Sequence, residues 1–415
     1  MHTKQTRLLV VIALFLLVGV GLIAAFTKLP LFQKTPSVAP IVPTANTETQ
    51  LPPAPKQTHI PMPNPVKAIY MTSWVGSVKP WREQLVSFIN TSEINAVVID
   101  VKDYSGTLSF DTQDPELQAY QEVRIKDLRD FIKHLHDNHI YVIARITVFQ
   151  DPTYAKMHPN LAVQSVAFGQ PWKDKHGLSY IDPSAKPFWE HIVRIAKASE
   201  AAGFDELNFD YIRFPTDGNM KDMAFPLTGA ITKPQIVEVL ASSNTTSEST
   251  TASLSATQKV FRSKKQQALK HFFAYLHEEL KDLGVPISAD LFGMVLTSRD
   301  DLNIGQVLET AAPYFDVICP MIYPSHYPPG FNQFANPADH PYEIVKAVLN
   351  SGGARLEAAG YPRTKLRPWL QDFNLGATYD AQKIRLQKQA CKDAGIASWL
   401  FWDPRNKYTR GGYDQ

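Results

Sequence analysis

The amino-acid sequence predicts an α/β fold, a (β/α)8 TIM barrel, for the chain after residue 65. Short apolar segments rich in β-branched residues alternate with longer segments of helical period, a pattern typical of a parallel sheet whose strands are joined by helices. Eight such apolar segments occur, which is the number that closes this barrel. Polar residues follow the segments directly, where barrels of this kind carry their functional side chains.

The amino-terminal 30 residues have a different character. Lys4 and Arg7 precede an uninterrupted apolar run over residues 8–26. At about 1.5 Å per residue the run would span ~28 Å, close to the hydrocarbon thickness of a bilayer. No Ala-x-Ala cleavage site follows, although cleavage after Ala25 stays open. We therefore expect residues 1–30 to form a signal anchor, in a single-pass protein of the cell membrane with its catalytic domain outside the cytoplasm.

Residues 31–65 alternate Pro with Ser, Thr, Ala and Gln, so we expect a semi-extended, Pro-rich linker. The folded domain is predicted for residues 66–415.

The chain carries 42 Lys and Arg against 40 Asp and Glu, without clusters of basic residues, so nucleic acid is not expected as a partner. Cys319 and Cys391 are interpreted as two buried thiols, with a bridge between them left open.

Eight strands and at least five helices are expected in the folded domain. The predicted strands are residues 68–73, 96–101, 141–147, 206–210, 287–291, 317–321, 365–370 and 397–402. The predicted helices include residues 126–136, 187–201, 264–283, 304–312 and 381–394.

The largest insertion into this pattern covers residues 217–257. Its tract 242–251 is rich in Ser and Thr and poor in apolar residues, so we expect it to be mobile. Asn244-Thr245-Thr246 has the form of a glycosylation sequon, which in such a tract is better explained by chance.

The segment 203–215 carries the clearest indication of function. It predicts a buried strand that ends in charge at Asp210, and Pro215 then prevents further pairing. Polar and aromatic residues follow the other predicted strands in the same way. We expect substrate binding by Asp100, Lys102, Arg145, Asn208, Arg213, Tyr323, His326, Trp369, Gln371 and Trp402.

Two carboxylates at neighbouring strand ends are the predicted catalytic pair. Asp210 and Asp290 would lie close together if their strands are adjacent in one barrel. Carboxyl groups in different environments can divide acid and base work, as the hydrolysis of glycosidic bonds requires. Arg213 could hold one of the two ionised.

Structural interpretations of the same residues stay open. An Asp at a strand end beside an Arg is often only an ion pair, and a tryptophan there is often only packing. His326 fits a hydrogen-bonding role as well as a substrate contact. The sequence has no H-E-x-x-H motif, no Cys/His cluster and no phosphate-binding glycine loop, so we predict no metal site and no cofactor. A divalent ion held by acidic side chains of the site stays an open alternative.

Six segments of the chain resemble a glycoside hydrolase family of prokaryotes that forms TIM barrels and is largely defined from sequence. They are residues 95–103, 141–146, 204–215, 288–293, 318–327 and 367–373, which together extend over nearly the whole folded part. The resemblance implies a barrel that acts on carbohydrate, with Asp210 and Asp290 on the strands where related sugar hydrolases keep catalytic carboxylates.

The segment from Gly203 to Asp210 is also loosely similar to the strand signature of chitinases, which continues to a glutamic acid two residues beyond its last Asp. That position is Ile212, or Leu207 in the other register, so the chitinase proton donor is missing. Asp290 would then donate the proton. We expect a glycosidase acting on a cell-envelope or extracellular polysaccharide or oligosaccharide. A glycan-binding barrel without activity is the principal alternative, and a carbohydrate esterase is disfavoured because its His-rich metal set is absent.

Overall fold

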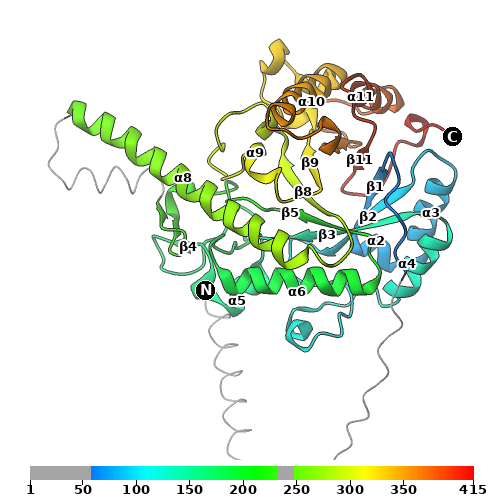
Figure 1. Cartoon of the computed structure of the whole chain (residues 1–415), viewed down its shortest axis with the longest axis horizontal. Helices are drawn as coiled ribbons and strands as arrows, with labels where there is room; N and C mark the ends of the chain where they lie inside the picture. The colour runs from blue at the N-terminus through cyan, green and yellow to red at the C-terminus, as the bar shows by residue number, and fades with distance from the viewer. Residues whose placement is uncertain (1–57, 232–246) are drawn as a thin grey trace, which may run out of the picture. The chain divides into compact units, whose positions relative to one another are not determined.

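The computed structural model describes residues 58–231 and 247–415. Eight parallel strands close a barrel in the order β1-β11-β10-β9-β8-β5-β3-β2, which confirms the predicted barrel (Figure 1). The barrel strands are β1 (Lys67–Met71), β2 (Ala96–Lys102), β3 (Tyr141–Thr147), β5 (Glu206–Asp210), β8 (Ile287–Phe292), β9 (Val317–Met321), β10 (Trp369–Gln371) and β11 (Trp399–Trp402).

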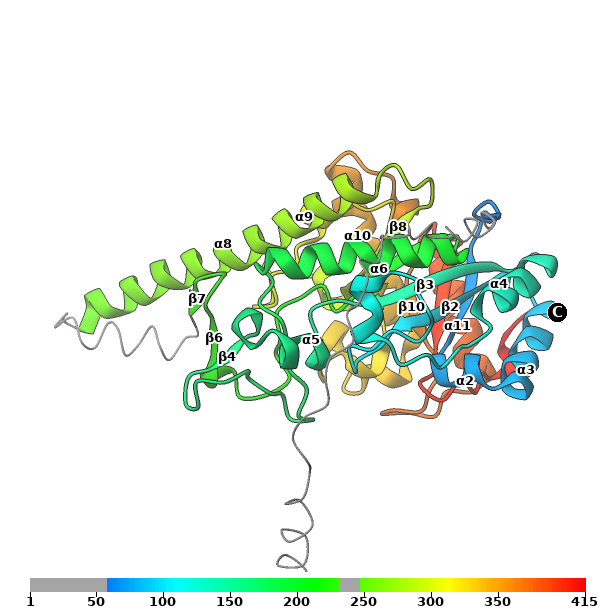
Figure 2. The ribbon, with the colours of Figure 1, turned by 90° about the horizontal axis from the view of Figure 1, so that it is seen from below.

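Helices cover the outer face of the barrel. They are α2 (Ser73–Ser77), α3 (Lys79–Asn90), α4 (Leu128–Asp137), α5 (Pro152–Met157), α6 (Lys186–Ala202), α8 (Ser247–Leu280), α9 (Leu308–Ala311), α10 (Pro341–Ala358) and α11 (Ala381–Asp393). Figure 2 shows α6 and α8 running side by side, and the two helices pack together. The helix predicted over residues 304–312 is reduced to the four residues of α9.

The sequence pattern did not indicate α10, because Ser351, Gly352 and Gly353 interrupt its helical period. The structure shows why a glycine is needed there. A Cβ atom on Gly352 would lie 2.5 Å from Cδ2 of Leu296, so the helix can approach the loop after β8 only without a side chain at this position.

The insertion is more ordered than the sequence indicated. A small antiparallel sheet joins β4 (Gln164–Ser165) to β6 (Met223–Phe225) and β7 (Ala230–Ile231). Helix α8 begins at Ser247, so the last five residues of the tract 242–251, which the sequence analysis left without regular structure, are helical. The sequon at Asn244 lies outside the described residues.

The predicted anchor, residues 1–30, and most of the linker also lie outside the described part of the chain. Among the helices that the structure describes, none is long and apolar enough to cross a membrane. The last linker residues lie against the barrel, where the backbone N–H of Ile60 donates to Asp205 Oδ1 at 2.9 Å.

Apolar residues pack in two places: between the strands and the surrounding helices, and inside the barrel. The interior also holds a buried ion pair, in which Arg367 Nη2 lies 2.6 Å from Glu206 Oε1. Ser288 Oγ donates to the same oxygen at 2.6 Å, and Tyr141 Oη donates to Oε2 at 3.3 Å. Because Glu206 begins β5 and Asp210 ends it, this pair fills the barrel beneath the carboxyl ends of the strands.

The interior ion pair gives a test of what holds the barrel together. Replacing Glu206 by Leu leaves the guanidinium of Arg367 buried without its carboxylate, which we expect to lower the free energy of unfolding by roughly 3–5 kcal/mol. The double variant Glu206→Leu/Arg367→Met removes both charges and should recover most of that loss. Urea unfolding followed by tryptophan fluorescence measures both, and a double variant as unstable as the single one would contradict the expectation.

Candidate active site

The predicted site residues meet at the carboxyl end of the barrel because alternate residues of each strand face its interior. On β3 the interior positions are Tyr141, Ile143 and Arg145. The strand pairing sets Arg145 beside Asp100 on β2 and beside Asn208 on β5. The interior positions of these strands therefore bring charged side chains from separate parts of the chain together.

Arg145 connects two of the carboxylates. Its Nη1 donates to Asp100 Oδ1 at 2.7 Å, while Nε donates to Asp210 Oδ2 at 3.0 Å and Nη2 donates to the same oxygen. Burial alone would lower the pKa of Arg145, but Asp210 and Asp100 raise it well above the ordinary value. The guanidinium is thus a fixed positive charge beside Asp210. The sequence had suggested Arg213 for this role, and the structure corrects it, because Arg213 Nη2 pairs with Asp217 at 2.8 Å.

The backbone after Asp210 has an unusual conformation. Tyr211 has a φ of 52°, in the left-handed region that bulky residues rarely adopt. Its N–H donates to Asp210 Oδ1 at 2.6 Å, so both oxygens of this carboxylate are hydrogen-bonded. Backbone strain of this kind is concentrated at functional sites.

Asp290 is a buried carboxyl with one engaged oxygen. Its Oδ1 accepts hydrogen bonds from Asn208 Nδ2 and Trp369 Nε1, both at 2.8 Å. Burial, and next the charge of Asp210, raise the pKa of Asp290 well above its usual range. Among the described residues no donor is bonded to Oδ2. Asp290 therefore suits a carboxyl that keeps its proton to a higher pH than a solvated aspartic acid does and presents it on Oδ2.

Aromatic rings form the other side of the site. Tyr323 stacks on Trp402 with ring centroids 5.5 Å apart, and Phe373 meets both rings edge-on. His326 lies edge-on to Tyr323 at 5.4 Å, and burial lowers the pKa of its imidazole. The rings come from the half of the barrel around β9, β10 and β11, whereas the carboxylates come from β2, β5 and β8. An apolar face opposite convergent polar groups is a suitable arrangement for binding a sugar ring.

Gln371 and Lys102 have positions that the sequence did not anticipate. Gln371 is fully buried; its Oε1 accepts from Ser325 N–H at 3.2 Å, and its Nε2 donates to the carbonyl of Phe373 at 2.9 Å. It positions the loops that carry His326 and Phe373.

Lys102 does not join the other predicted residues. The pairing of β2 with β3 shifts by one residue between Asp100 and Lys102, which turns the lysine to the outer face of the barrel. There it is fully buried and its Nζ lies 2.9 Å from Asp151 Oδ2. A fully buried ammonium with its own carboxylate is placed for structure, so the expectation that Lys102 binds substrate is corrected.

Tyr70 is a site residue that the sequence analysis missed. Its hydroxyl donates to Asp100 Oδ2, and its ring lies edge-on to Trp369 and tilted against Trp402. The alternation of Ala68 and Tyr70 with outward-facing residues along β1 could have indicated it, because both lie in the barrel interior. Phe373 was missed as well, since it lies in the loop beyond the strand end.

Within the described residues, no cluster of three or more His, Cys, Asp or Glu side chains is arranged to hold a metal ion. Cys319 and Cys391 are both buried, and the two thiols are not bridged.

Comparison with known proteins identifies the family of the chain. Residues 68–408 match the sequence profile of a family described as "Putative glycosyl hydrolase domain". No curated protein matches the chain significantly in sequence.

Among solved structures, the PgaB (BpsB) glycoside hydrolase domain from Bordetella bronchiseptica is similar with a TM-score of 0.53 and 12% identity, over 82% of this chain and 94% of that one. The α-L-fucosidase isoenzyme 2 from Paenibacillus thiaminolyticus gives a TM-score of 0.52 at 10% identity, over 85% of this chain and 47% of the fucosidase chain. These likenesses show a shared fold. A hypothetical protein from Ruminiclostridium thermocellum ATCC 27405 is 31% identical over 54% of this chain and 96% of its own length, with a TM-score of 0.42.

The environment of Asp290 predicts a pH-dependent effect on stability. A carboxyl whose pKa is raised by folding contributes stability that is present below its unfolded value of about 3.9 and is lost as the pH rises through the folded value. Asp290→Asn has no such proton to lose. We therefore expect the variant to gain stability relative to the wild type as the pH rises from about 4 to about 8. Urea unfolding across this range measures the difference, and a difference that does not change with pH would contradict it.

Proposed function

The chain belongs to the family of this glycosyl hydrolase domain, and we propose that it cleaves a cell-envelope or extracellular polysaccharide with Asp290 as proton donor and Asp210 as its carboxylate partner. The observation that carries the proposal is the difference between the two carboxyl environments. Burial and a neighbouring negative charge favour a protonated Asp290, whereas Asp210 accepts two hydrogen bonds from the cationic Arg145. Glycosidic hydrolysis uses one carboxyl in each state.

In the proposed reaction Asp290 donates its proton from Oδ2 to the glycosidic oxygen, and the bond from that oxygen to the anomeric carbon breaks. Asp210 stabilises the positive charge that develops on the sugar, and it either attacks the anomeric carbon or removes a proton from the attacking water. Retention or inversion of the anomeric configuration in the product distinguishes these two roles.

The aromatic half of the barrel supports a sugar as the bound group. Tyr323, Trp402 and Phe373 offer ring faces and edges to an apolar sugar face, and Asp100 and Asn208 on the opposite half offer hydrogen-bonding groups to hydroxyls. The predicted anchor over residues 1–30 supports a polymer outside the cytoplasm as substrate. It would hold the domain at the membrane surface, near the polysaccharides of the envelope.

Product release tests the proposal. The protein is incubated with a panel of envelope and extracellular polysaccharides, and new reducing ends are measured. Asp210→Asn and Asp290→Asn should each lower the rate by roughly 10²–10⁴-fold, because each removes one acid or base function. Asp137→Asn is the matched control, since this carboxylate lies exposed on α4 and should leave the rate unchanged. Glycan binding without product release, equal in all four proteins, would instead support a glycan-binding barrel.

The pH dependence of the rate tests the assignment of the donor. Because Asp290 must be protonated, kcat/KM should fall as the pH rises through the raised pKa of Asp290. In Asp290→Asn the residual rate should lack this fall on the alkaline side. A profile of kcat/KM against pH for both proteins on one substrate measures it, and an identical alkaline limb in the two would remove Asp290 from the donor role.

A further inference from the structure

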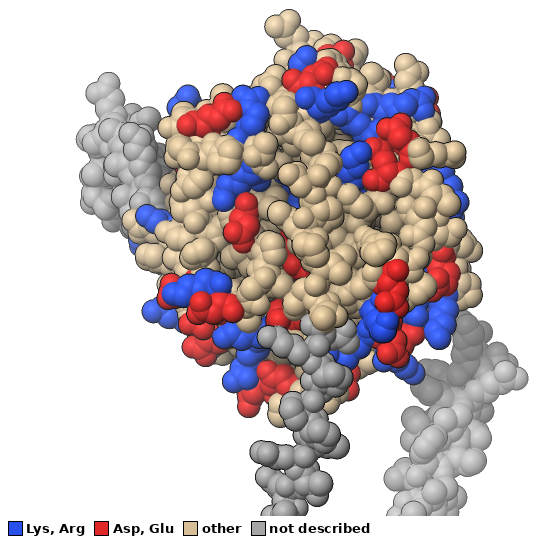
Figure 3. All heavy atoms as spheres, turned by 45° about the vertical axis from the view of Figure 1, so that its right-hand side comes forward, with Lys and Arg blue, Asp and Glu red and all other residues tan. Residues whose placement is uncertain are grey.

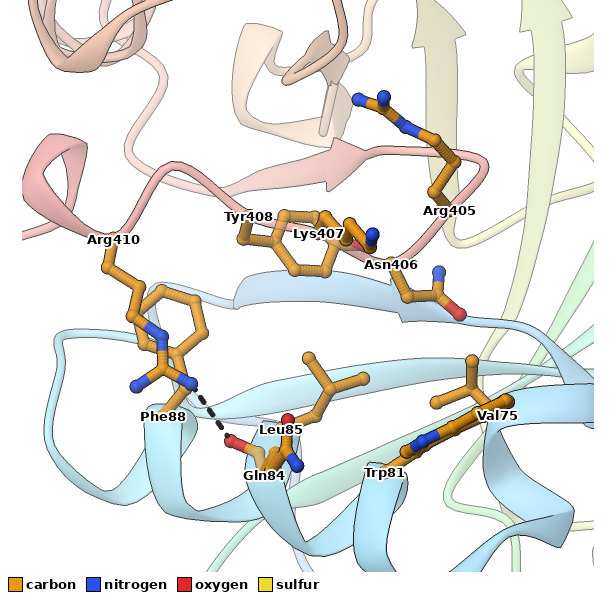
Figure 4. Close-up of a pocket in the computed structure, with 10 residues that line it drawn as sticks. All are labelled: Val75, Trp81, Gln84, Leu85, Phe88, Arg405, Asn406, Lys407, Tyr408 and Arg410. Atoms are coloured by element: carbon orange, nitrogen blue, oxygen red, sulfur yellow. Dashed lines mark hydrogen bonds between the residues drawn. The ribbon is translucent and has the colours of Figure 1, made fainter.

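A pocket lies between α3 and the loop that follows β11, and its lining residue Tyr408 is bonded to Tyr70 of β1. It has a volume of about 540 Å³ and includes Trp81, Phe88, Lys407, Tyr408 and Arg410 in its lining. Figure 4 shows Tyr408 on the loop above α3, which carries Trp81 and Phe88. A volume of this size is within the range of roughly 300–1,000 Å³ found for pockets that bind small ligands.

Hydrogen bonds through a single residue, Tyr70, connect the pocket to the charged side chains of the active site. Tyr408 Oη donates to the carbonyl of Tyr70 at 2.5 Å and accepts from the N–H of Tyr70 at 2.9 Å. The side chain of Tyr70 in turn donates to Asp100, which is bonded to Arg145. Since β1 and β11 are neighbours, a polymer bound at the carboxyl ends of the strands could extend from the site into this pocket.

The charged residues that line the pocket are all basic. Its lining includes Arg405, Lys407 and Arg410 and no acidic residue. Arg405 pairs with Asp403 at 3.1 Å, and Figure 4 shows it pointing away from α3. Lys407 and Arg410 have no carboxylate partner within the part of the chain that the structure describes. Figure 3 shows one face of the molecule, on which acidic and basic side chains are interspersed.

Aromatic rings lie beside these cations. Trp81 is 54% exposed as a residue, which is unusual for so large an apolar side chain. The guanidinium of Arg410 lies 5.1 Å from the ring centre of Phe88 and donates to the carbonyl of Gln84 at 3.4 Å. A flat apolar face next to unpaired cations complements a pyranose ring that carries a carboxylate directly. A polyol phosphate chain fits the pocket less well, because it carries the negative charge but has no ring to lie on the apolar face.

We infer that this pocket is a subsite for a uronic acid residue of the polysaccharide, with the sugar ring on Trp81 and its carboxylate near Lys407. The inference rests on the proposed function for the polymer but concerns binding alone. It narrows the substrate class to acidic polysaccharides.

Binding of defined oligosaccharides by the full-length protein tests the subsite. Oligogalacturonate and oligomannuronate are titrated at low salt by calorimetry, each next to its carboxyl-reduced neutral counterpart. We expect at least one acidic oligosaccharide to bind more tightly than its neutral counterpart. Lys407→Gln should weaken the binding of that acidic ligand roughly tenfold, because a charge-assisted contact is lost. It should leave the neutral one unchanged.

Two further variants separate the parts of the pocket. Trp81→Ala should weaken acidic and neutral ligands by a similar factor, because it removes the apolar face that both would use. Lys270→Gln is the matched control: this lysine is exposed on α8, the helix that leads into β8 on the opposite side of the barrel from β1. It should change neither affinity.

The subsite is overturned if neither acidic oligosaccharide binds, if acidic and neutral ligands bind equally, or if Lys407→Gln has no larger effect than Lys270→Gln. The experiment distinguishes this failure from that of the proposed function. Product release from neutral polymers without any preference for acidic ligands would contradict the subsite and support the glycosidase activity. Binding that depends on Lys407, without product release from any polymer, would support the subsite and contradict the glycosidase activity.

Discussion

The site depends on the buried guanidinium of Arg145, which is shared by Asp100 and Asp210. Three charged groups are largely buried inside the barrel, and each is held there because another compensates its charge. Two carboxylates against one guanidinium already leave an excess of negative charge. A third carboxyl in the same interior, Asp290, holds its proton more strongly than a solvated one because it is buried and, next, because the charge of Asp210 lies nearby. The chemical difference between Asp210 and Asp290 thus follows from burial and from the charge balance inside the barrel.

The barrel then divides this interior into two halves. Strands β2, β3, β5 and β8 carry the charged groups Asp100, Arg145, Asp210 and Asp290, whereas Tyr70, Trp369 and Trp402 lie on β1, β10 and β11 and Tyr323 follows β9. Hydrogen bonds cross between the halves, since Tyr70 donates to Asp100 and Trp369 donates to Asp290. The aromatic residues consequently fix the orientation of the carboxyls as well as offering a surface to a sugar. Beneath both halves, the pair of Glu206 and Arg367 keeps the interior filled.

The loop after β11 links the site to the surface around it. Asn406 donates to the carbonyl of Tyr70 at 3.1 Å and accepts from Thr72 N–H at 2.9 Å, so the loop is bonded to the end of β1. The same loop presents Lys407 and Tyr408 to the pocket above α3. One short segment therefore both supports Tyr70 in the active site and provides a basic surface within reach of an extended substrate.

The sequence by itself determined the fold class and most of the residues that meet at the carboxyl ends of the strands. Alternating strand and helix patterns are local, and they gave the eight strands within a few residues; the strand ends then indicated Asp100, Arg145, Asn208, Asp210 and Asp290. The tertiary structure decided the partners. A single extra residue in β2 turned Lys102 outward, and the pairing of β3 with β5, which no local pattern encodes, placed Arg145 rather than Arg213 beside Asp210. The pocket joins Trp81 to Lys407, so only the packing of distant segments could create it. The periodicity of the sequence shows on which face of a strand a side chain lies. The charged group that it contacts depends on which strands become neighbours.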